Sequence, residues 1–430
     1  MIHIRRRTVS VPQRLISTLT LIGLVLSMTV SVGQPRVARA VSSIVTNTND
    51  SGPGSVRQAI LDANGAAGAD TITFGVAGTI TLTSGELPIT SDIGITGPGA
   101  SSLTISGNNA SRIFNITAGT VSIAGVTLSQ GNVGGAAGSA IVNRGVLTVS
   151  NGRFVNNNRS SAGTIWSDGT LTVQESTFSG NVANNGPGIY AGGIVTIERS
   201  TFSGNNADVS DGGAIYAAGT MTISNSTFSG NSGGLGGGLV TGCGSSAAVT
   251  IINSTFAGNT AGSGGGIYRC SGSVTTKNTV FANNTGGNCV GIVSAGYNLS
   301  SDSTCGGIAG DRINTAPQLG PLQNNGGPTL THALLTGSPA INAGTNIGCP
   351  AVDQRAIQRP LGLFCDIGAV ELQQPLIQLG NYAWPDAMEL TLTPVSTGVT
   401  NASVDEHLAL QDQSAWFKFK VQPGANVSVA

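Results

Sequence analysis

The chain has 430 residues, 64 of them Gly, and only 9% of its side chains are charged, 19 basic and 20 acidic. So few charges are atypical of an ordinary globular enzyme, and the positive mean hydropathy argues against wholesale disorder. Gly follows no three-residue period, which excludes collagen. A composition rich in Gly, Ser, Thr, Asn and Val is typical of short strands joined by many turns.

The N-terminus has the pattern of an export signal. Three Arg at 5–7 precede an uncharged run over 15–33, and Ala38-Arg39-Ala40 follows. We expect residues 1–40 to be a signal peptide cleaved after Ala40, with an uncleaved single-span anchor as the alternative. Cleavage removes six Arg and no acid, which changes the net charge from −1 to −7. The remaining chain is therefore expected to bind no nucleic acid and to contain no transmembrane helix.

A repeat of 24 to 28 residues runs through the middle of the chain. The hexapeptide Ser-Thr-Phe-Ser-Gly-Asn occurs at 176–181, 200–205 and 226–231, and three apolar columns share the same period. These columns are Phe154, Phe178, Phe202, Phe228, Phe256 and Phe281; Ile141, Ile165, Ile189, Ile215, Leu239 and Ile267; and Leu147, Leu171, Val195, Met221, Val249 and Val274.

Each repeat contains short apolar runs between Gly, Asn and Ser turns, with no segment long enough for an internal helix. A single repeat of this kind cannot bury its apolar face. Stacked coils can, because the strands of neighbouring coils pair and the coils share one interior. The predicted fold is all-β: a right-handed parallel β-helix (solenoid) over 71–314 with a short N-terminal capping helix, followed by an incomplete β-sandwich-like segment. At ~4.8 Å per rung, about nine coils over 71–300 predict a rod roughly 40–45 Å long.

An Asn follows each Phe of the first column by three residues. We expect the Phe rings to stack along the rod, and Asn suits left-handed turns and can bond to the copies above and below it. Our interpretation is an inward structural ladder of turn amides; a polar binding ladder is the alternative. The ladder residues are Asn157, Asn181, Asn205, Asn231, Asn259 and Asn284.

All six Cys lie late in the chain, and their even number in an exported protein predicts disulfides. No Cys-x-x-Cys spacing of a zinc or redox site occurs. Cys243 and Cys270 occupy nearly equivalent positions on adjacent coils, a separation that suits a disulfide. The order of the other four and their short loops suggest Cys289–Cys305 and Cys349–Cys365.

The repeat resembles a known family of motifs. Gly-Gly-Ala-Ile at 212–215 and Phe-Ser-Gly-Asn at 202–205 and 228–231 are similar to the paired signatures of polymorphic outer membrane protein repeats. Looser copies extend the resemblance over about residues 135–285. It implies a surface adhesin of β-helix type.

The first segment of the exported chain, residues 41–70, looks like the N-terminal cap of bacterial surface β-helix proteins with a Cys-Ser-Leu-Arg-Glu-Ala motif. Here residues 54–59 read Gly-Ser-Val-Arg-Gln-Ala, without the Cys and with Gln for Glu, so no disulfide is expected at the cap. Ser55 and Gln58 predict a capping box for a short helix that covers the open end of the first coil.

Residues 315–372 are similar to the choice-of-anchor region of such surface proteins, on Pro-Gln-Leu-Gly-Pro-Leu at 317–322, Gly-Ser-Pro-Ala-Ile at 337–341 and Cys-Asp-Ile-Gly-Ala at 365–369. The resemblance implies a module that closes the β-helix. Residues 373–430 resemble the opening half of a β-sandwich of the pre-peptidase C-terminal type, with a strand expected over 416–421, and we expect the chain to be a fragment.

Candidate catalytic residues are few. Five acids lie between residues 101 and 300, and the best pair is Glu175 with Glu198, at neighbouring positions on adjacent coils, for which solvated surface carboxylates are the simpler interpretation. In the closing region we interpret four charged residues as a structural ion-pair network: Asp353, Arg355, Arg359 and Asp366. The other acids of the repeat are Asp168, Asp208 and Asp211.

The sequence therefore predicts a non-enzymatic protein, secreted or held at the cell surface or outer membrane, that acts as an adhesin or structural spacer. Its expected partners are glycans or other cell-surface proteins, bound by weak multivalent contacts. No catalytic residue, cofactor or metal site is expected. The alternatives are a β-helix polysaccharide lyase or glycoside hydrolase, and a binding module of a larger secreted enzyme.

Overall fold

The computed structural model describes residues 40–158, 160–208 and 212–373. Beyond residue 373 it describes only the short strands β36 (Met388–Glu389), β37 (Thr393–Ser396), β38 (Val399–Asn401) and β39 (Phe417–Lys418). The predicted signal peptide and most of the predicted β-sandwich segment, including most of its strand over 416–421, therefore lie outside the described residues.

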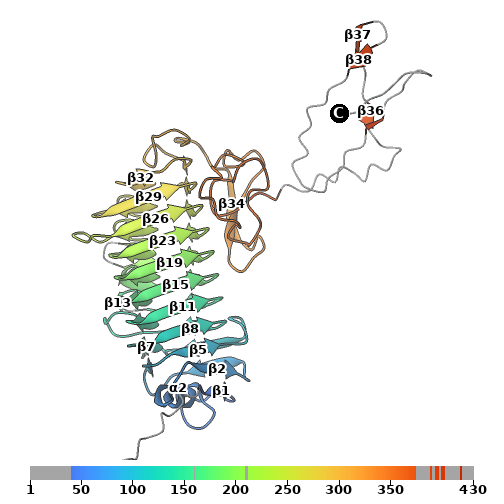
Figure 1. Cartoon of the computed structure of the whole chain (residues 1–430). Helices are drawn as coiled ribbons and strands as arrows, with labels where there is room; N and C mark the ends of the chain where they lie inside the picture. The colour runs from blue at the N-terminus through green and yellow to red at the C-terminus, as the bar shows by residue number, and fades with distance from the viewer. Residues whose placement is uncertain are drawn as a thin grey trace, which may run out of the picture.

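The described chain is a right-handed parallel β-helix of about ten turns, as the repeat predicts (Figure 1). Each regular coil contributes one strand to each of three long parallel sheets, so that β11 pairs with β15 and β15 with β19 along the axis. Sheet A contains β1 (Ser42–Val45), β2 (Asp70–Phe74), β5 (Ile93–Thr96), β8 (Thr120–Ala124), β11 (Val146–Ser150), β15 (Thr170–Gln174), β19 (Ile194–Glu198), β23 (Thr220–Ser224), β26 (Ala248–Ile252), β29 (Ser273–Lys277) and β32 (Val293–Ser294).

Sheets B and C complete the coil, and a small fourth sheet widens three of the turns. Sheet B contains β3 (Gly78–Thr81), β6 (Leu103–Ser106), β9 (Thr127–Ser129), β12 (Arg153–Val155), β16 (Thr177–Ser179), β20 (Thr201–Ser203), β24 (Thr227–Ser229), β27 (Thr255–Ala257), β30 (Val280–Ala282) and β33 (Leu299–Ser300). Sheet C contains β4 (Leu87–Ile89), β7 (Phe114–Ile116), β10 (Ile141–Asn143), β14 (Ile165–Ser167), β18 (Ile189–Ala191), β22 (Ile215–Ala217), β25 (Leu239–Thr241), β28 (Ile267–Arg269) and β31 (Cys289–Val290). The small sheet contains β13 (Ser160–Ala162), β17 (Val182–Asn185) and β21 (Asn206–Ala207).

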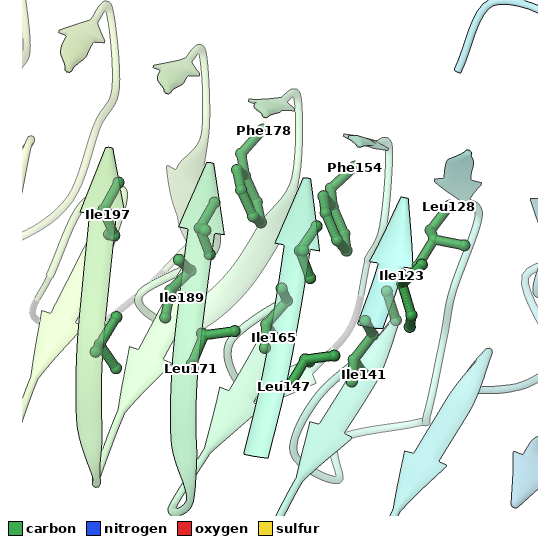
Figure 2. Packing of buried hydrophobic residues seen from close by; sticks show 14 of the residues in the cluster. Ile123, Leu128, Ile141, Leu147, Phe154, Ile165, Leu171, Phe178, Ile189 and Ile197 are labelled. Carbon is green, nitrogen blue, oxygen red and sulfur yellow. The ribbon is translucent and has the colours of Figure 1, made fainter. Parts of the chain in front are cut away.

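The interior is a stack of similar layers, because residues one repeat apart lie directly over each other. Phe154 pairs with Phe178 and Phe178 with Phe202, and neighbouring rings of the six-Phe column stack with centroids 4.4–5.5 Å apart. Figure 2 shows Phe154 and Phe178 over Leu128, with the Ile column of sheet C on the opposite wall. Every Phe of the column is at most 1% exposed, so the core is a continuous apolar rod.

The six predicted Asn form one buried hydrogen-bonded ladder. Asn181 Nδ2 donates to Asn205 Oδ1 at 2.9 Å and to the carbonyl of Phe154 at 2.9 Å, and the other members repeat this pattern. Each side-chain oxygen also accepts from the backbone N–H of the previous Asn, except that of Asn157, which accepts from the N–H of Gly131. A seventh residue that the spacing did not reveal, Asn288, accepts from Asn284 and ends the ladder.

A second ladder of hydroxyls runs beside the Asn and was missed in the sequence. Ser176, Ser200, Ser226 and Ser254 are fully buried, and each Oγ accepts a backbone N–H from the coil before it. Each Oγ–H in turn donates to the carbonyl two residues earlier. Ser and Thr are so frequent in this chain that the column does not stand out.

The N-terminal helix α2 (Val56–Gly65) lies over the first coil, as expected of a cap (Figure 1). Ser55 is its N-cap and accepts from the backbone N–H of Gln58 at 3.2 Å. The predicted reciprocal half of the capping box is absent, because Gln58 Nε2 donates to Asp62 and the N–H of Ser55 donates to the carbonyl of Gly52. Half of the capping box is therefore formed.

Residues 315–373, which include β34 (Leu319–Gln323) and β35 (Thr331–Leu334), lie beside the coils and not across the end of the rod (Figure 1). Thr201, Thr227 and Thr255 face outward from sheet B, yet each is at most 2% exposed because this region covers them. The hydroxyl of Thr227 donates to Gln354 at 2.6 Å, and Thr255 accepts from the N–H of Ala369 at 3.0 Å. The region expected to close the β-helix thus covers the flank of sheet B, where the Thr row offers hydroxyl partners.

Among the residues that the structure describes, no helix has the length and apolar character needed to cross a membrane.

The Asn ladder predicts a large cost for one interior substitution. Asn205→Ala removes the acceptor of the backbone N–H of Asn181 and one of the two acceptors of its side-chain amide. It also removes the side-chain donor to Asn231 Oδ1 and to the carbonyl of Phe178. We expect a loss of about 3 kcal/mol in the free energy of unfolding, measured by urea denaturation. The matched control, Asn206→Ala, alters an exposed side chain and should cost less than about 0.5 kcal/mol. Equal costs for the two variants would contradict an inward ladder.

The cap should lose stability in acid. Burial raises the pKa of Asp50, but hydrogen bonds from Ser84, Arg57 and Thr83 outweigh it and lower the pKa to about 2. Because the folded pKa lies below the unfolded value, the stabilisation is complete above pH 4 and disappears as the pH falls toward 2. The protection factors of the α2 amides, which correct for the pH dependence of intrinsic exchange, should therefore fall over this window, and Asp50→Asn should abolish the dependence. An unchanged pH profile in that variant would disprove the role of Asp50.

Candidate functional site

The best predicted acid pair is held in a surface ion triad. Arg199 donates to Glu175 at 2.7 Å and lies 3.8 Å from Glu198, and all three side chains are partly exposed. Glu175 and Arg199 both have positive φ, 49° and 48°, at the turn position where the next coils carry Asn225 and Asn253. The structure therefore brings the two acids together, but each is paired with the guanidinium of Arg199. The spacing of the acids did not indicate this arginine. Asp208 is exposed, and Asp211 lies outside the described residues.

The four predicted charges of the closing region form a buried network with a fifth member, Glu371. Arg355 pairs with Asp353 at 2.7 Å, and Arg359 pairs with Glu371 at 3.0 Å. Asp366 accepts backbone N–H groups from Asn342 and Leu372. Burial raises the pKa of Asp366 and Glu371 and lowers that of Arg359. Glu371 lies five residues beyond the last predicted member, in a segment with no repeat, so no spacing pointed to it.

The network is buried. Arg359 and Glu371 are at most 1% exposed on their side chains, and Arg359 also donates to the carbonyls of Asp366 and Gly368. Asp353 accepts from the N–H groups of Arg355 and Ile357. These bonds connect the loops of the closing region, which contains few strands. They support the interpretation that the charged residues have a structural role.

All six cysteines are paired as the order suggests. Cys243–Cys270, Cys289–Cys305 and Cys349–Cys365 have Cα atoms 4.9, 5.2 and 6.7 Å apart. The first pair links adjacent coils, the second lies at the last coil and the third is in the closing region. Among the described residues, no three metal-ligating His, Cys, Asp or Glu side chains lie together.

A row of aromatic side chains, Trp166, Tyr190 and Tyr216, lies on the outer face of sheet C. The three rings stack in sequence, with centroids 6.5 and 4.9 Å apart, and Arg144 lies 5.3 Å over Trp166. All three rings are half-buried. The sequence signal was an aromatic residue directly after a member of the Ile column, since neighbouring residues in a strand point to opposite faces. The prediction relied on the inward columns alone, and it therefore missed this outward row.

The row borders an open groove where the chain turns from sheet C to sheet A. The groove has a volume of about 590 Å³ and is lined from four successive coils. Its floor is a column of Gly, because a Cβ on Gly145, Gly169 or Gly193 would lie 2.0–2.5 Å from the carbonyl oxygen of the Gly one coil earlier. Side chains of Arg144 and Asp168 stand on the side of the aromatic row.

The far side of the groove belongs to sheet A. Thr120, Val146, Thr170 and Ile194 follow the Gly column and pair in register along the axis. Val146 and Ile194, which point outward from sheet A, are 44% and 58% exposed. The groove therefore combines hydroxyls, two apolar side chains and a backbone floor, a mixture typical of ligand sites.

Comparisons with known proteins agree with the architecture. A family model described as a right-handed beta helix region matches residues 140–305, the part that holds the Phe and Asn ladders. The protein is a right-handed parallel β-helix protein. The search of curated proteins gives no match.

Two solved structures are similar at low identity. One is the pectate lyase Pel9A, 17% identical with a TM-score of 0.40, over 78% of this chain and 97% of that chain. The other is ORF18 of Geobacillus virus E2, 12% identical with a TM-score of 0.31, over 70% of this chain and 66% of that chain.

The buried network gives a further testable expectation. Glu371→Gln removes the carboxylate that compensates Arg359 and leaves a buried charge, which should destabilise the closing region by about 3–5 kcal/mol. The measurement is hydrogen exchange in residues 315–373. The control Glu198→Gln weakens a partly exposed ion pair and should cost less than about 1 kcal/mol. Equal losses of stability in the two variants would show that the buried network does not hold the closing region together.

Proposed function

We propose that the protein is an exported, non-enzymatic surface rod, an adhesin or structural spacer, that binds glycans through the outer face of sheet C. The observation that carries this proposal is the aromatic row beside an open groove on an otherwise polar, weakly charged rod. Stacked half-buried rings add apolar contact area at little entropic cost, because their neighbours already hold them in place.

The row also supplies polar groups. Burial raises the pKa of Tyr190, and Tyr216 and Asp168 act in the same direction, so its phenol remains protonated at neutral pH. A protonated phenol both donates and accepts hydrogen bonds, as sugar hydroxyls require. Arg144, packed on Trp166, adds a fixed cation at one end of the row.

A rigid rod suits such binding. The inward ladders and stacked rings hold the outer face of each coil at a constant spacing, so several weak contacts form together without a new ordering cost. The predicted export signal, the three disulfides and the resemblance to surface adhesins support a location outside the cell or on its surface.

The second candidate is a polysaccharide lyase or glycoside hydrolase that uses Glu175 and Glu198. One observation favours it: both residues lie on one edge of the rod within reach of the same guanidinium. Arg199 also occupies both carboxylates with its guanidinium, whereas a catalytic acid or base must face the substrate. We therefore rank this activity second.

One experiment separates the two candidates. The purified chain is incubated with a panel of polysaccharides, with and without Ca²⁺, and both turnover and binding are measured. We expect binding without turnover and a roughly tenfold weaker affinity for Trp166→Ala, the loss typical of a contact residue. Tyr297→Ala, which removes a partly exposed ring far from the row, is the control.

Two results would refute the proposal. Turnover that disappears in Glu175→Gln would establish the enzyme. Equal glycan binding by Trp166→Ala and the unmodified chain would exclude the outer face of sheet C as the binding surface.

A further inference from the structure

We propose that the groove between sheets C and A binds a linear, uncharged polysaccharide lengthwise, parallel to the axis of the rod. This inference rests on the proposed function, since it names the class of glycan and its orientation. Four observations carry it: the direction of the groove, its period, its lining and its charge.

The groove follows the axis of the rod. Its floor contains Gly119, Gly145, Gly169 and Gly193, one from each of four successive coils. At ~4.8 Å per rung these four coils span roughly 14 Å. A ligand that fills the groove is therefore long and narrow, and it meets the same backbone groups at each step.

The period of the groove matches an extended sugar chain. A β-1,4-linked pyranose chain advances by about one sugar per rung of a parallel sheet, so each sugar can lie against one coil. Because neighbouring sugars of such a chain are turned by about half a revolution, alternate sugars take equivalent places. A compact or strongly branched glycan lacks this repeat. Because a Cβ at Gly145, Gly169 or Gly193 would clash with the coil before it, the floor stays free of side chains, and flat sugar rings can approach the backbone.

The lining suits neutral sugars. Thr117, Thr120 and Thr170 supply hydroxyl groups, and the exposed side chains of Val146 and Ile194 supply apolar surface for the C–H faces of pyranose rings. A few polar groups for orientation beside apolar surface is the usual composition of a small-molecule site.

The charges disfavour a polyanion. Asp168 is exposed and is the one acid of the lining. Asp92 lies outside the lining, is also exposed and accepts from the N–H of Thr120, a lining residue, at 2.7 Å. Arg144 is the one cation of the lining, and its guanidinium is packed on Trp166. Two carboxylates and one guanidinium that is already packed on a ring give this part of the surface a net negative charge. At low ionic strength this charge repels a chain of uronates, whereas it does not affect the binding of an uncharged chain.

The test is calorimetric titration with oligomers of one to six sugars. The neutral probes are β-1,4-linked glucose, xylose, mannose and N-acetylglucosamine oligomers, and the acidic probes are α-1,4-linked galacturonate oligomers. We expect at least one neutral series to gain affinity up to about four sugars, the length of the groove, and then to level off. Galacturonate oligomers should bind at least about tenfold more weakly at low salt.

Two matched variants locate the site. Thr170→Glu places a bulky anion in the middle of the groove and should weaken the neutral tetramer at least about tenfold. Thr222→Glu makes the same change on the outer face of β23, outside the lining, and should leave the affinity unchanged. Circular dichroism of both variants checks that the coils remain folded.

The outcomes distinguish this inference from the proposed function. Affinity that is complete at one sugar, galacturonate binding equal to or tighter than neutral binding, or equal losses in both variants would overturn the lengthwise site. Binding of branched glycans alone would overturn the inference and leave the proposed function standing. Absence of binding to every glycan tested would overturn both.

Discussion

The structure depends on one constraint: the amide side chains that turn into the interior need hydrogen-bond partners there, and the Asn column finds them one coil away. The Asn ladder meets this requirement with two donors and one oxygen per residue, all used inside the rod. Because the partner of each amide is the same amide in the next coil, the register of the coils cannot slip by a residue without breaking the whole column. The Phe stack has the same register, so polar and apolar interactions specify one arrangement.

The same constraint decides which faces remain open. On sheet B the outward Thr row is covered by residues 315–373, and its hydroxyls bond to that region. Along the turn from sheet C to sheet A, by contrast, the close approach of successive Gly carbonyls leaves no room for side chains. The result is a rod with one covered flank and one grooved edge, and the grooved edge is bordered by the half-buried aromatic row and by the exposed side chains of Val146 and Ile194. A surface that is open, periodic and rigid suits a periodic ligand.

The sequence predicted those features that repeat, and it failed where a single position mattered. The Phe and Asn columns needed only a common period, so their stacking followed from spacing alone. Only one of the two hydrogen bonds of the predicted capping box forms, because the side chain of Gln58 donates to Asp62. The sequence correctly predicted that the two acids lie close together. It did not predict that Arg199 forms an ion pair with Glu175 of the coil before it. The aromatic row was visible as a residue after each Ile, yet its proximity to Arg144 and the groove required the folded coils.

Sequence by itself determined the fold class, the repeat, the ladders and the pairing of the cysteines. Each of these features joins residues that are one repeat apart or neighbours in cysteine order, so spacing and order were enough to predict it. Only the tertiary structure decided where residues 315–373 pack, that Glu371 compensates Arg359 and that the Gly column forms the floor of a groove. These contacts join positions with no common period, such as Thr227 and Gln354, 127 residues apart. Their proximity arises from the winding of the coils and the path of the returning chain, which no local pattern records.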